Sequence, residues 1–239
     1  VVEEFLVGEE VSYLVFTDGK TFKPMVYSQD HKQIYEGDKG PNTGGMGAYS
    51  PASLLKGKEN FLKNEVMGRF LKGVVAEGID YRGVLYIGFM MTSDGPKILE
   101  FNCRFGDPEA QVILPRMETD LIDVCMAVID QELENQEIIW NDKFCATVVL
   151  TSGGYPEQYK KGIVINGLEN VEGVQVIHAG TKKVDDKMVT NGGRVLNIVA
   201  TGQTLKKTIN KIYNEIPKIN FELMYYRNDI AWKELGREE

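Results

Sequence analysis

The residue pattern best suited to chemistry is Glu100-Phe101-Asn102, which ends an apolar run expected to form a strand. Side chains two positions apart on a strand point to the same face. Glu100 and Asn102 therefore present a carboxylate and an amide oxygen together, while Phe101 points back into the core. Such hard oxygen donors suit Mg²⁺, which takes one or two protein ligands and completes its shell with water and phosphate oxygens. The same alternation is also typical of an ordinary half-exposed strand, so spacing alone leaves both interpretations open.

Arg104 follows this pair and precedes Phe105-Gly106-Asp107-Pro108-Glu109. An arginine here could hold a carboxylate or a phosphate through two parallel hydrogen bonds, and it could equally form a surface ion pair. Asp107 followed by proline predicts the N-cap and first position of a short helix.

A glycine-rich segment spans 37–47, where five of eleven residues are glycine. Glycines without a Cβ allow backbone N–H groups to turn toward an anion. The segment is neither a Walker A loop nor a dinucleotide-binding fingerprint, and a generic flexible loop remains the alternative. Just before it, Asp30 and Lys32 are consistent with a solvated ion pair or with a phosphate contact, and His31 with a surface or hydrogen-bonding role.

Two acidic pairs, Glu3-Glu4 and Glu9-Glu10, flank Phe5-Leu6. A carboxylate that accepts from both ribose hydroxyls, next to backbone groups that read adenine, would form a nucleotide hinge. Charged residues at strand ends are also common, so this pattern alone does not distinguish a nucleotide hinge from an ordinary strand end.

The elements that must position these residues form an α+β chain. Apolar periodicity predicts a helix over 58–77, ended by Gly78, and a second over 119–134. The inner face of that second helix is predicted to carry Leu121, Val124, Cys125, Val128 and Ile129. Strands are predicted at 1–7, 11–16, 21–27, 83–91 and 97–102, then 144–150, 173–179, 193–201 and 222–226, with a late helix at 204–217. No regular structure is expected over 29–51, and a change of texture near residue 136 predicts two domains, 1–135 and 136–239.

Composition narrows the function classes. The 27 basic and 35 acidic side chains give a net charge of −8, which argues against nucleic acid or an anionic membrane as the main partner. The three cysteines are widely spaced and form no CxxC pair, which fits a reducing cytoplasm. The chain opens in the middle of an apparent strand, so we expect an upstream part of the protein to be absent from it.

Together these blocks resemble the phosphoribosylamine–glycine ligase family, ATP-grasp enzymes of purine biosynthesis. The resemblance rests on the following segments, in this order: Glu3-Glu4-Phe5-Leu6-Val7-Gly8-Glu9-Glu10, Gln29-Asp30-His31-Lys32, Gly40-Pro41-Asn42-Thr43-Gly44-Gly45-Met46-Gly47-Ala48-Tyr49-Ser50-Pro51, Glu100-Phe101-Asn102-Cys103-Arg104-Phe105-Gly106-Asp107-Pro108-Glu109, Gly153-Gly154-Tyr155-Pro156, His178-Ala179-Gly180-Thr181 and Thr190-Asn191-Gly192-Gly193-Arg194-Val195-Leu196.

The resemblance implies the second half of an ATP-grasp domain followed by a small mixed β/α C-terminal domain. It implies a reaction in which ATP, glycine and 5-phosphoribosylamine give glycinamide ribonucleotide through glycyl phosphate. By the family pattern, Glu100 and Asn102 ligate Mg²⁺ or Mn²⁺, and Arg104 and Asp107 serve catalysis at the phosphates.

The remaining roles that the resemblance implies concern the nucleotide and the acceptor substrates. Glu3, Phe5, Leu6 and Glu10 would border the nucleotide, and the substrate-binding residues would be Asp30, Lys32, Asn42, Gly44, Gly45 and Met46. The family's N-terminal portion, which supplies the lysines over the ATP phosphates, has no counterpart here and is the expected partner. Two alternatives stay open: another ATP-grasp carboxylate–amine ligase, and a non-catalytic binding or assembly module.

Overall fold

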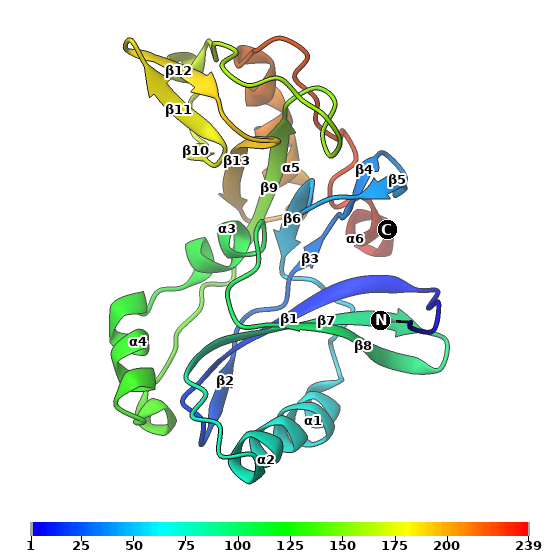
Figure 1. Cartoon of the computed structure of the whole chain (residues 1–239), viewed down its shortest axis with the longest axis vertical. Helices are drawn as coiled ribbons and strands as arrows, with labels where there is room; N and C mark the ends of the chain where they lie inside the picture. Colours follow the sequence, from blue (N-terminus) through cyan, green and yellow to red (C-terminus); the bar gives the residue numbers. More distant parts are fainter. Residues whose placement is uncertain (1, 239) are drawn as a thin grey trace. The chain divides into compact units, whose positions relative to one another are not determined.

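The computed structural model describes residues 2–238, and it divides into two compact units (Figure 1). Unit 1 comprises the residues up to Gln29, Pro51–Gly106 and Arg116–Asn141. Unit 2 comprises Asp30–Ser50, Asp107–Pro115 and Asp142–Glu239. Each unit therefore takes segments from distant parts of the sequence. Both units contain residues on each side of position 136, where the sequence predicted a single domain boundary.

Unit 1 is built on a four-stranded antiparallel sheet in the order β2-β1-β7-β8. Asp-Gly turns connect its two hairpins, and their glycines, Gly19 and Gly95, adopt the positive φ values of 85° and 105° that such turns favour. The strands are β1 (Glu9–Thr17), β2 (Phe22–Pro24), β7 (Gly83–Thr92) and β8 (Gly95–Asn102).

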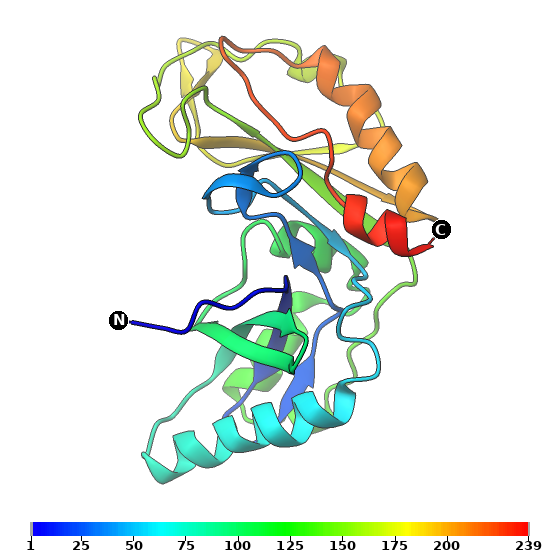
Figure 2. The same ribbon diagram turned by 90° about the vertical axis from the view of Figure 1, so that its right-hand side faces the viewer.

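A long helical segment covers one face of this sheet (Figure 2). It runs through α1 (Glu59–Phe61), a π-helical stretch over Leu62–Met67, and α2 (Gly68–Ala76). Gly78, with φ of 67°, follows its C-terminus, which confirms the predicted helix over 58–77. Aromatic contacts of Phe61 with Phe89 and of Phe70 with Phe101 join the helix to the sheet.

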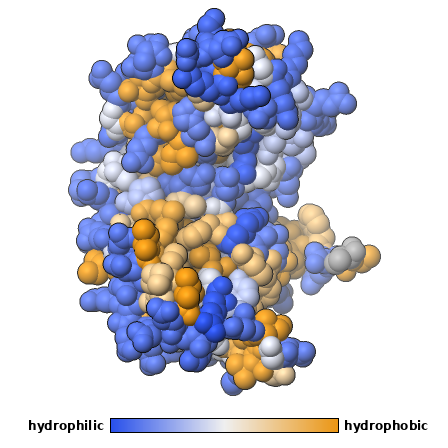
Figure 3. Space-filling model, turned by 60° about the vertical axis from the view of Figure 1, so that its left-hand side comes forward, coloured by the Kyte–Doolittle hydropathy of each residue, from blue (hydrophilic) through white to orange (hydrophobic). Residues whose placement is uncertain are grey.

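Helix α4 (Leu121–Ile129) is shorter than the predicted 119–134 and turns fewer side chains inward. Val124 and Val128 are buried, as predicted, but the prediction for Cys125 and Ile129 is wrong, because both are exposed. The helix packs mainly through a narrow stripe four residues apart, and Leu121, also predicted to face inward, is only half-buried. Figure 3 shows apolar side chains gathered on one face of this unit.

Unit 2 is built on a five-stranded sheet in the order β10-β13-β9-β6-β3, flanked by two small hairpins, β4-β5 and β11-β12. Its strands are β3 (Gln29–Asp30), β4 (Gln33–Tyr35), β5 (Lys39–Asn42), β6 (Gly47–Ser50), β9 (Phe144–Thr151), β10 (Gln175–His178), β11 (Thr181–Val184), β12 (Lys187–Thr190) and β13 (Arg194–Gly202). Its helices are α3 (Ala110–Ile113), α5 (Leu205–Glu215) and α6 (Trp232–Glu238). Short 3-10 turns at Leu114–Arg116, Leu133–Asn135, Leu168–Asn170 and Ile216–Lys218 complete the helical elements of the two units.

Two sequence expectations for unit 2 are wrong. The stretch 29–51 contains four short strands, because β4 and β5 pair with each other while β3 and β6 join the five-stranded sheet, where β6 pairs with the distant β9. The segment 222–226 is no strand, and it contributes one isolated bridge from Tyr225 to Thr151. Among the described residues no helix is long and apolar enough to cross a membrane.

Candidate functional site

The face of the unit 1 sheet opposite α2 carries Glu10 and the two predicted metal ligands. The antiparallel register places Glu10 opposite Met90 and Glu100 opposite Gly88, with Asn102 opposite Tyr86. Residues directly opposite each other share a face, and so do residues two apart along a strand. Glu10, Glu100 and Asn102 therefore project from the same side of the sheet.

Gly88 leaves space for the Glu100 side chain on this face. A Cβ built on Gly88 would lie 3.2 Å from Cγ of Glu100, so a larger residue there would crowd the carboxylate. Glu100 is exposed, and the Asn102 amide oxygen accepts a 3.4 Å hydrogen bond from Arg104 Nη2. An oxygen pair that solvent can reach fits a hydrated divalent ion such as Mg²⁺.

Phe101 is on the opposite face, as predicted, where its ring stacks on Phe70 at 6.0 Å between centroids. It is nevertheless 48% exposed, because β8 is an edge strand and the helix covers only part of it. No group of three or more His, Cys, Asp or Glu in the described residues could hold a metal ion.

The residues predicted to border adenine lie in an extended segment before β1. The predicted strand over 1–7 is wrong for residues 2–7, which have no regular structure, and residue 1 lies outside the described part. Glu3 is exposed, Leu6 is half-buried, and Phe5 is 90% exposed. Gly8 packs tightly on the next strand, since a Cβ there would lie 2.1 Å from the Met91 carbonyl oxygen. The adenine-binding role of this segment stays a prediction.

The glycine-rich segment of unit 2 uses its backbone donors within the protein. The N–H of Gly44 donates to the Tyr155 hydroxyl at 3.0 Å, and that of Gly45 donates to Thr43 Oγ1 at 2.9 Å. The N–H of Met46 donates to the carbonyl of His31 at 2.8 Å. These three amides are therefore bonded within the protein, and an anion-binding role for the glycine-rich segment stays a prediction.

Met46 is one of the predicted substrate residues, and its substrate-binding role stays a prediction. Its side chain is completely buried, and its carbonyl accepts a hydrogen bond from Val149 N. Gly45 is also buried, whereas Asn42 and Gly44 are exposed. Of the predicted loop residues, Asn42 is thus the one whose side chain can reach a ligand.

Asp30 and Lys32 form an ion pair, with 2.8 Å between Lys32 Nζ and Asp30 Oδ2. The Asp30 side chain is only 2% exposed, and its second oxygen has no hydrogen-bond partner among the described residues. A buried carboxylate with one unpaired oxygen is costly unless a ligand uses it. This pair is therefore more than the solvated surface pair that the sequence allowed.

Asp107 has a different role from the predicted N-cap of α3. Glu109 precedes the helix, and no side chain caps it. The Asp107 carboxylate instead accepts from Gln111 Nε2 at 2.9 Å and lies 3.2 Å from Arg194 Nη1. The same Arg194 nitrogen donates to the carbonyls of Gly44 and Asp107, both at 2.7 Å. Arg194 thereby ties the glycine-rich segment to the start of α3 within unit 2. Arg104, by contrast, belongs to unit 1.

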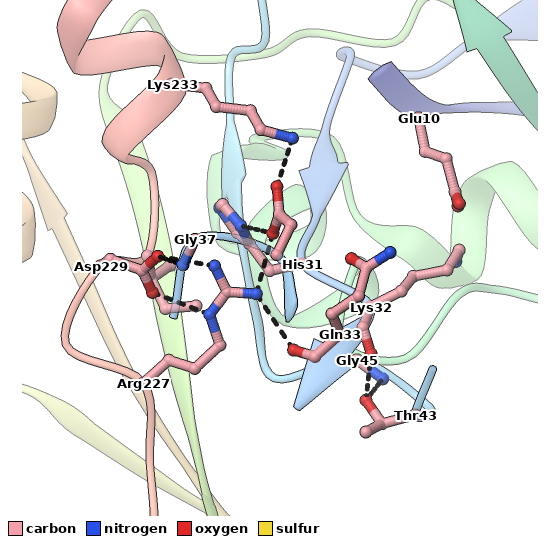
Figure 4. Close-up of polar contacts among 12 residues, drawn as sticks. Glu10, His31, Lys32, Gln33, Gly37, Thr43, Gly45, Arg227, Asp229 and Lys233 are labelled. Carbon is pink, nitrogen blue, oxygen red and sulfur yellow. Dashed lines mark hydrogen bonds and ion pairs between the residues drawn. The ribbon is translucent and has the colours of Figure 1, made fainter. Parts of the chain in front are cut away.

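A charged cluster at the C-terminal end of unit 2 holds the other side of this segment (Figure 4). Arg227 is completely buried and donates two hydrogen bonds to Asp229, at 2.7 and 2.8 Å. It also donates to Asp38 at 2.9 Å and to the Gln33 carbonyl at 3.0 Å. Lys233 forms a second ion pair with Asp38. Burial alone would raise the pKa of Asp38, but hydrogen bonds from His31, Lys233 and Arg227 hold it well below its usual range.

His31 is part of this cluster and serves structure rather than proton transfer. Its Nε2 accepts the backbone N–H of Ala231 at 3.0 Å, and its Nδ1 faces Asp38 at 3.5 Å. A ring nitrogen that accepts a backbone N–H has no free lone pair for a substrate proton. The hydrogen-bonding role that the sequence allowed for this histidine is the one observed.

The lowered pKa of Asp38 predicts acid sensitivity. A carboxyl whose folded pKa is depressed stabilises the protein above its ordinary pKa of about 3.9 and loses that contribution as the pH falls below it. We expect urea unfolding of Asp38→Asn to depend less on pH than that of the wild type below about pH 4. Asp185→Asn, at an exposed turn, is the control and should follow the wild type. Parallel pH profiles of wild type and Asp38→Asn would contradict the assignment.

Sequence reasoning missed Arg227 and Asp229 and left Arg194 and Tyr155 without a role. Arg194 and Tyr155 lie inside quoted motifs, but only the fold shows that both reach Gly44. The sequence does place Arg227 two residues before Asp229, just ahead of the apolar pair Ile230-Ala231. That spacing was the available signal for a buried ion pair.

The fold and this arrangement define an ATP-grasp protein, and comparisons with known proteins agree. Residues 1–110 match the ATP-grasp (A) domain of phosphoribosylglycinamide synthetase, and residues 145–233 match its C domain. The chain belongs to the phosphoribosylglycinamide synthetase family, with these two domains in order.

Two curated relatives illustrate the likeness. Phosphoribosylamine–glycine ligase of Vibrio parahaemolyticus is 47% identical over 243 residues, covering 100% of this chain and 57% of that protein. The trifunctional purine biosynthetic protein adenosine-3 of Gallus gallus is 51% identical over 241 residues, covering 99% of this chain and 24% of that protein. The chain thus spans little more than half the length of the bacterial relative.

Solved structures give the same picture. Phosphoribosylamine–glycine ligase from Thermotoga maritima aligns with a TM-score of 0.83 at 35% identity, covering 96% of this chain and 57% of that one. The biotin carboxylase of Campylobacter jejuni in complex with an ATP analogue aligns with a TM-score of 0.62 over 98% of this chain and 51% of that one. At 14% identity the second likeness shows the fold alone.

Proposed function

We propose that the protein carrying this chain ligates glycine to 5-phosphoribosylamine with ATP, giving glycinamide ribonucleotide, ADP and phosphate. The observation that carries the proposal is that Glu10, Glu100 and Asn102 project from the same face of one sheet, within a segment that matches the family's ATP-grasp domain. The cytoplasm is the proposed location. Because the bacterial relative is longer than this chain, the proposal concerns the protein with the family's remaining length present.

Glu100 and Asn102 would hold Mg²⁺ or Mn²⁺ against the ATP phosphates. A bound divalent ion supplies charge neutralisation to the phosphoryl group as it transfers. The Glu10 carboxylate faces the same side and suits the ribose hydroxyls of the nucleotide. Arg104, hydrogen-bonded to Asn102, brings a guanidinium beside the oxygen pair, where it can meet phosphate or acyl phosphate oxygens.

Unit 2 would bind glycine and the amine substrate. The unpartnered oxygen of Asp30 suits an N–H donor such as an amino group, and Lys32 offers a cation for a carboxylate or phosphate. Asn42 is exposed on the glycine-rich segment that follows Asp30 and Lys32 in the chain. In this scheme glycyl phosphate forms when the glycine carboxylate attacks the γ-phosphate, and the amine then displaces phosphate.

The test is ADP release by the complete protein with glycine and 5-phosphoribosylamine, each omitted in turn. We expect release to require glycine and product to require both substrates. Alanine, β-alanine and acetate serve as competing acids, and faster turnover with one of them would assign a different ATP-grasp carboxylate–amine ligase. Absence of nucleotide binding and of any ADP release would favour a binding or assembly module instead.

A further inference from the structure

The segment Arg227–Lys233, just ahead of and into α6, carries no role in the reaction proposed above, yet it contacts the substrate segment of unit 2 more than once. Asp229 Oδ2 accepts the N–H of Gly37 at 2.7 Å, and Asn228 donates to Glu36 Oε1 from its backbone and its side chain. These bonds join residues about 190 positions apart in the sequence. The two segments therefore form one hydrogen-bonded layer.

Arg227 is the centre of that layer (Figure 4). Its guanidinium is wholly buried and bonded on one edge to Asp229 and on the other to Asp38 and the Gln33 carbonyl. A planar guanidinium with fixed donor directions sets the orientation of both carboxylates, which a lysine at this position could not do. Asp38 has a positive φ of 52°, an unfavourable conformation that the surrounding bonds must hold.

Covalent neighbours and hydrogen bonds connect this layer to the residues predicted to bind glycine and the amine substrate. His31, held at both ring nitrogens, shares its backbone with the neighbouring Asp30 and Lys32. The Lys32 carbonyl accepts from both the N–H and the hydroxyl of Thr43, each at 2.7 Å, and that hydroxyl accepts the N–H of Gly45. A short chain of bonds therefore leads from Arg227 to Asp30, Lys32 and the Asn42–Gly45 turn.

We infer that Arg227 is a positioning residue for the glycine and amine site, acting through Asp38 and Asp229 on the segment Asp30–Gly45. This inference rests on the proposed function for its substrates, but its structural half can be tested without them. Misplacing a binding group by about 1 Å can lower turnover a hundredfold, so a loosened segment should weaken substrate binding while the ATP face is untouched.

The structural test is amide hydrogen exchange in Arg227→Met, Arg227→Lys and the control Arg82→Met, whose arginine forms an ion pair with Asp80 in unit 1. We expect exchange in residues 37–46 to rise at least about tenfold in Arg227→Met and less in Arg227→Lys, because the lysine keeps the charge but loses the fork. Strands β9 and β13 should keep their protection, and Arg82→Met should match the wild type. Unchanged exchange in residues 37–46, or equal loss in β9 and β13, would overturn the inference.

The functional test measures the Michaelis constants for glycine, 5-phosphoribosylamine and ATP in the complete protein. We expect Arg227→Met to raise KM for glycine or 5-phosphoribosylamine about tenfold or more, with KM for ATP within twofold of the wild type, and Arg227→Lys to recover part of the loss. An equal rise in KM for ATP would overturn a positioning role.

Two safeguards keep the outcomes separate. Lys233→Met removes the Lys233 ion pair to Asp38 and leaves the Arg227 bonds in place. If Arg227→Met does not fold, Lys233→Met should produce the same pattern at smaller size, and an unchanged pattern in Lys233→Met would overturn the inference. If the wild type shows no glycine-dependent activity while the exchange pattern holds, the proposed function fails and the structural link stands.

Discussion

Glu100→Gln is expected to lower glycine-dependent ADP release about a hundredfold or more at limiting Mg²⁺ in the complete protein. The substitution keeps the size of the side chain and removes one negative charge from a pair of ligands. With Asn102 neutral, Glu100 is the charged member of the pair that binds the cation, so metal affinity should fall first. Raising Mg²⁺ should restore part of the rate, because excess ion compensates for weaker binding.

The matched control for that experiment is Glu77→Gln. Glu77 is an exposed glutamate at the end of α2, the helix that covers the other face of the same sheet. It changes net charge by the same amount without touching the Glu10, Glu100 and Asn102 face. Equal turnover of Glu100→Gln and Glu77→Gln at limiting Mg²⁺ would exclude the metal assignment.

The sequence predicted the parts of unit 1 that follow from local pattern. Alternation predicted that Glu100 and Asn102 share one side of β8, and apolar periodicity predicted the helical segment that Gly78 follows. These features depend on neighbouring residues or on the two-residue period of a strand, so the order of residues in the sequence is enough to predict them. The α+β class and the family resemblance could be predicted as well, because both rest on short segments of neighbouring residues.

Features that depend on distant contacts could not be predicted. The glycine-rich segment reads as a loop with free amides, but Tyr155 and His31 accept its N–H groups from remote positions. Likewise Asp107 looks like an N-cap until Arg194 is seen beside it. Local sequence indicates which nearby group a side chain or an amide could bond, whereas tertiary packing decides which group it does bond.

Helix α4 shows the opposite error, in which a strong pattern predicted too much. Its run of apolar residues, with Cys125 and Ile129 among them, reads as a wide buried face, yet only Val124 and Val128 are buried. Periodicity gives the direction of the inner stripe, but its width depends on how much of the sheet lies beneath the helix. The sequence alone contains no measure of that area.

Gly45→Ala is expected to destabilise unit 2 by about 2–4 kcal/mol, through strain and crowding together. Gly45 has φ of 114°, which L side chains rarely adopt, and a Cβ there would lie 2.4 Å from Cδ of Pro108. The proline ring cannot rotate away, so the turn or the start of α3 must shift. Because Arg194 donates to Gly44 and to Asp107, such a shift should also break the bonds that join the two segments.

Gly162→Ala isolates the two contributions. Gly162 lies in the same unit, has φ of 82°, and has no atom within 4 Å of a built Cβ. Its substitution therefore carries the backbone strain without the clash, and should cost about 1 kcal/mol. Urea denaturation of both variants gives the difference, which measures the contact with Pro108 alone. If the two variants lose the same stability, the turn has room for a methyl group and the glycine at position 45 is required only for its backbone conformation.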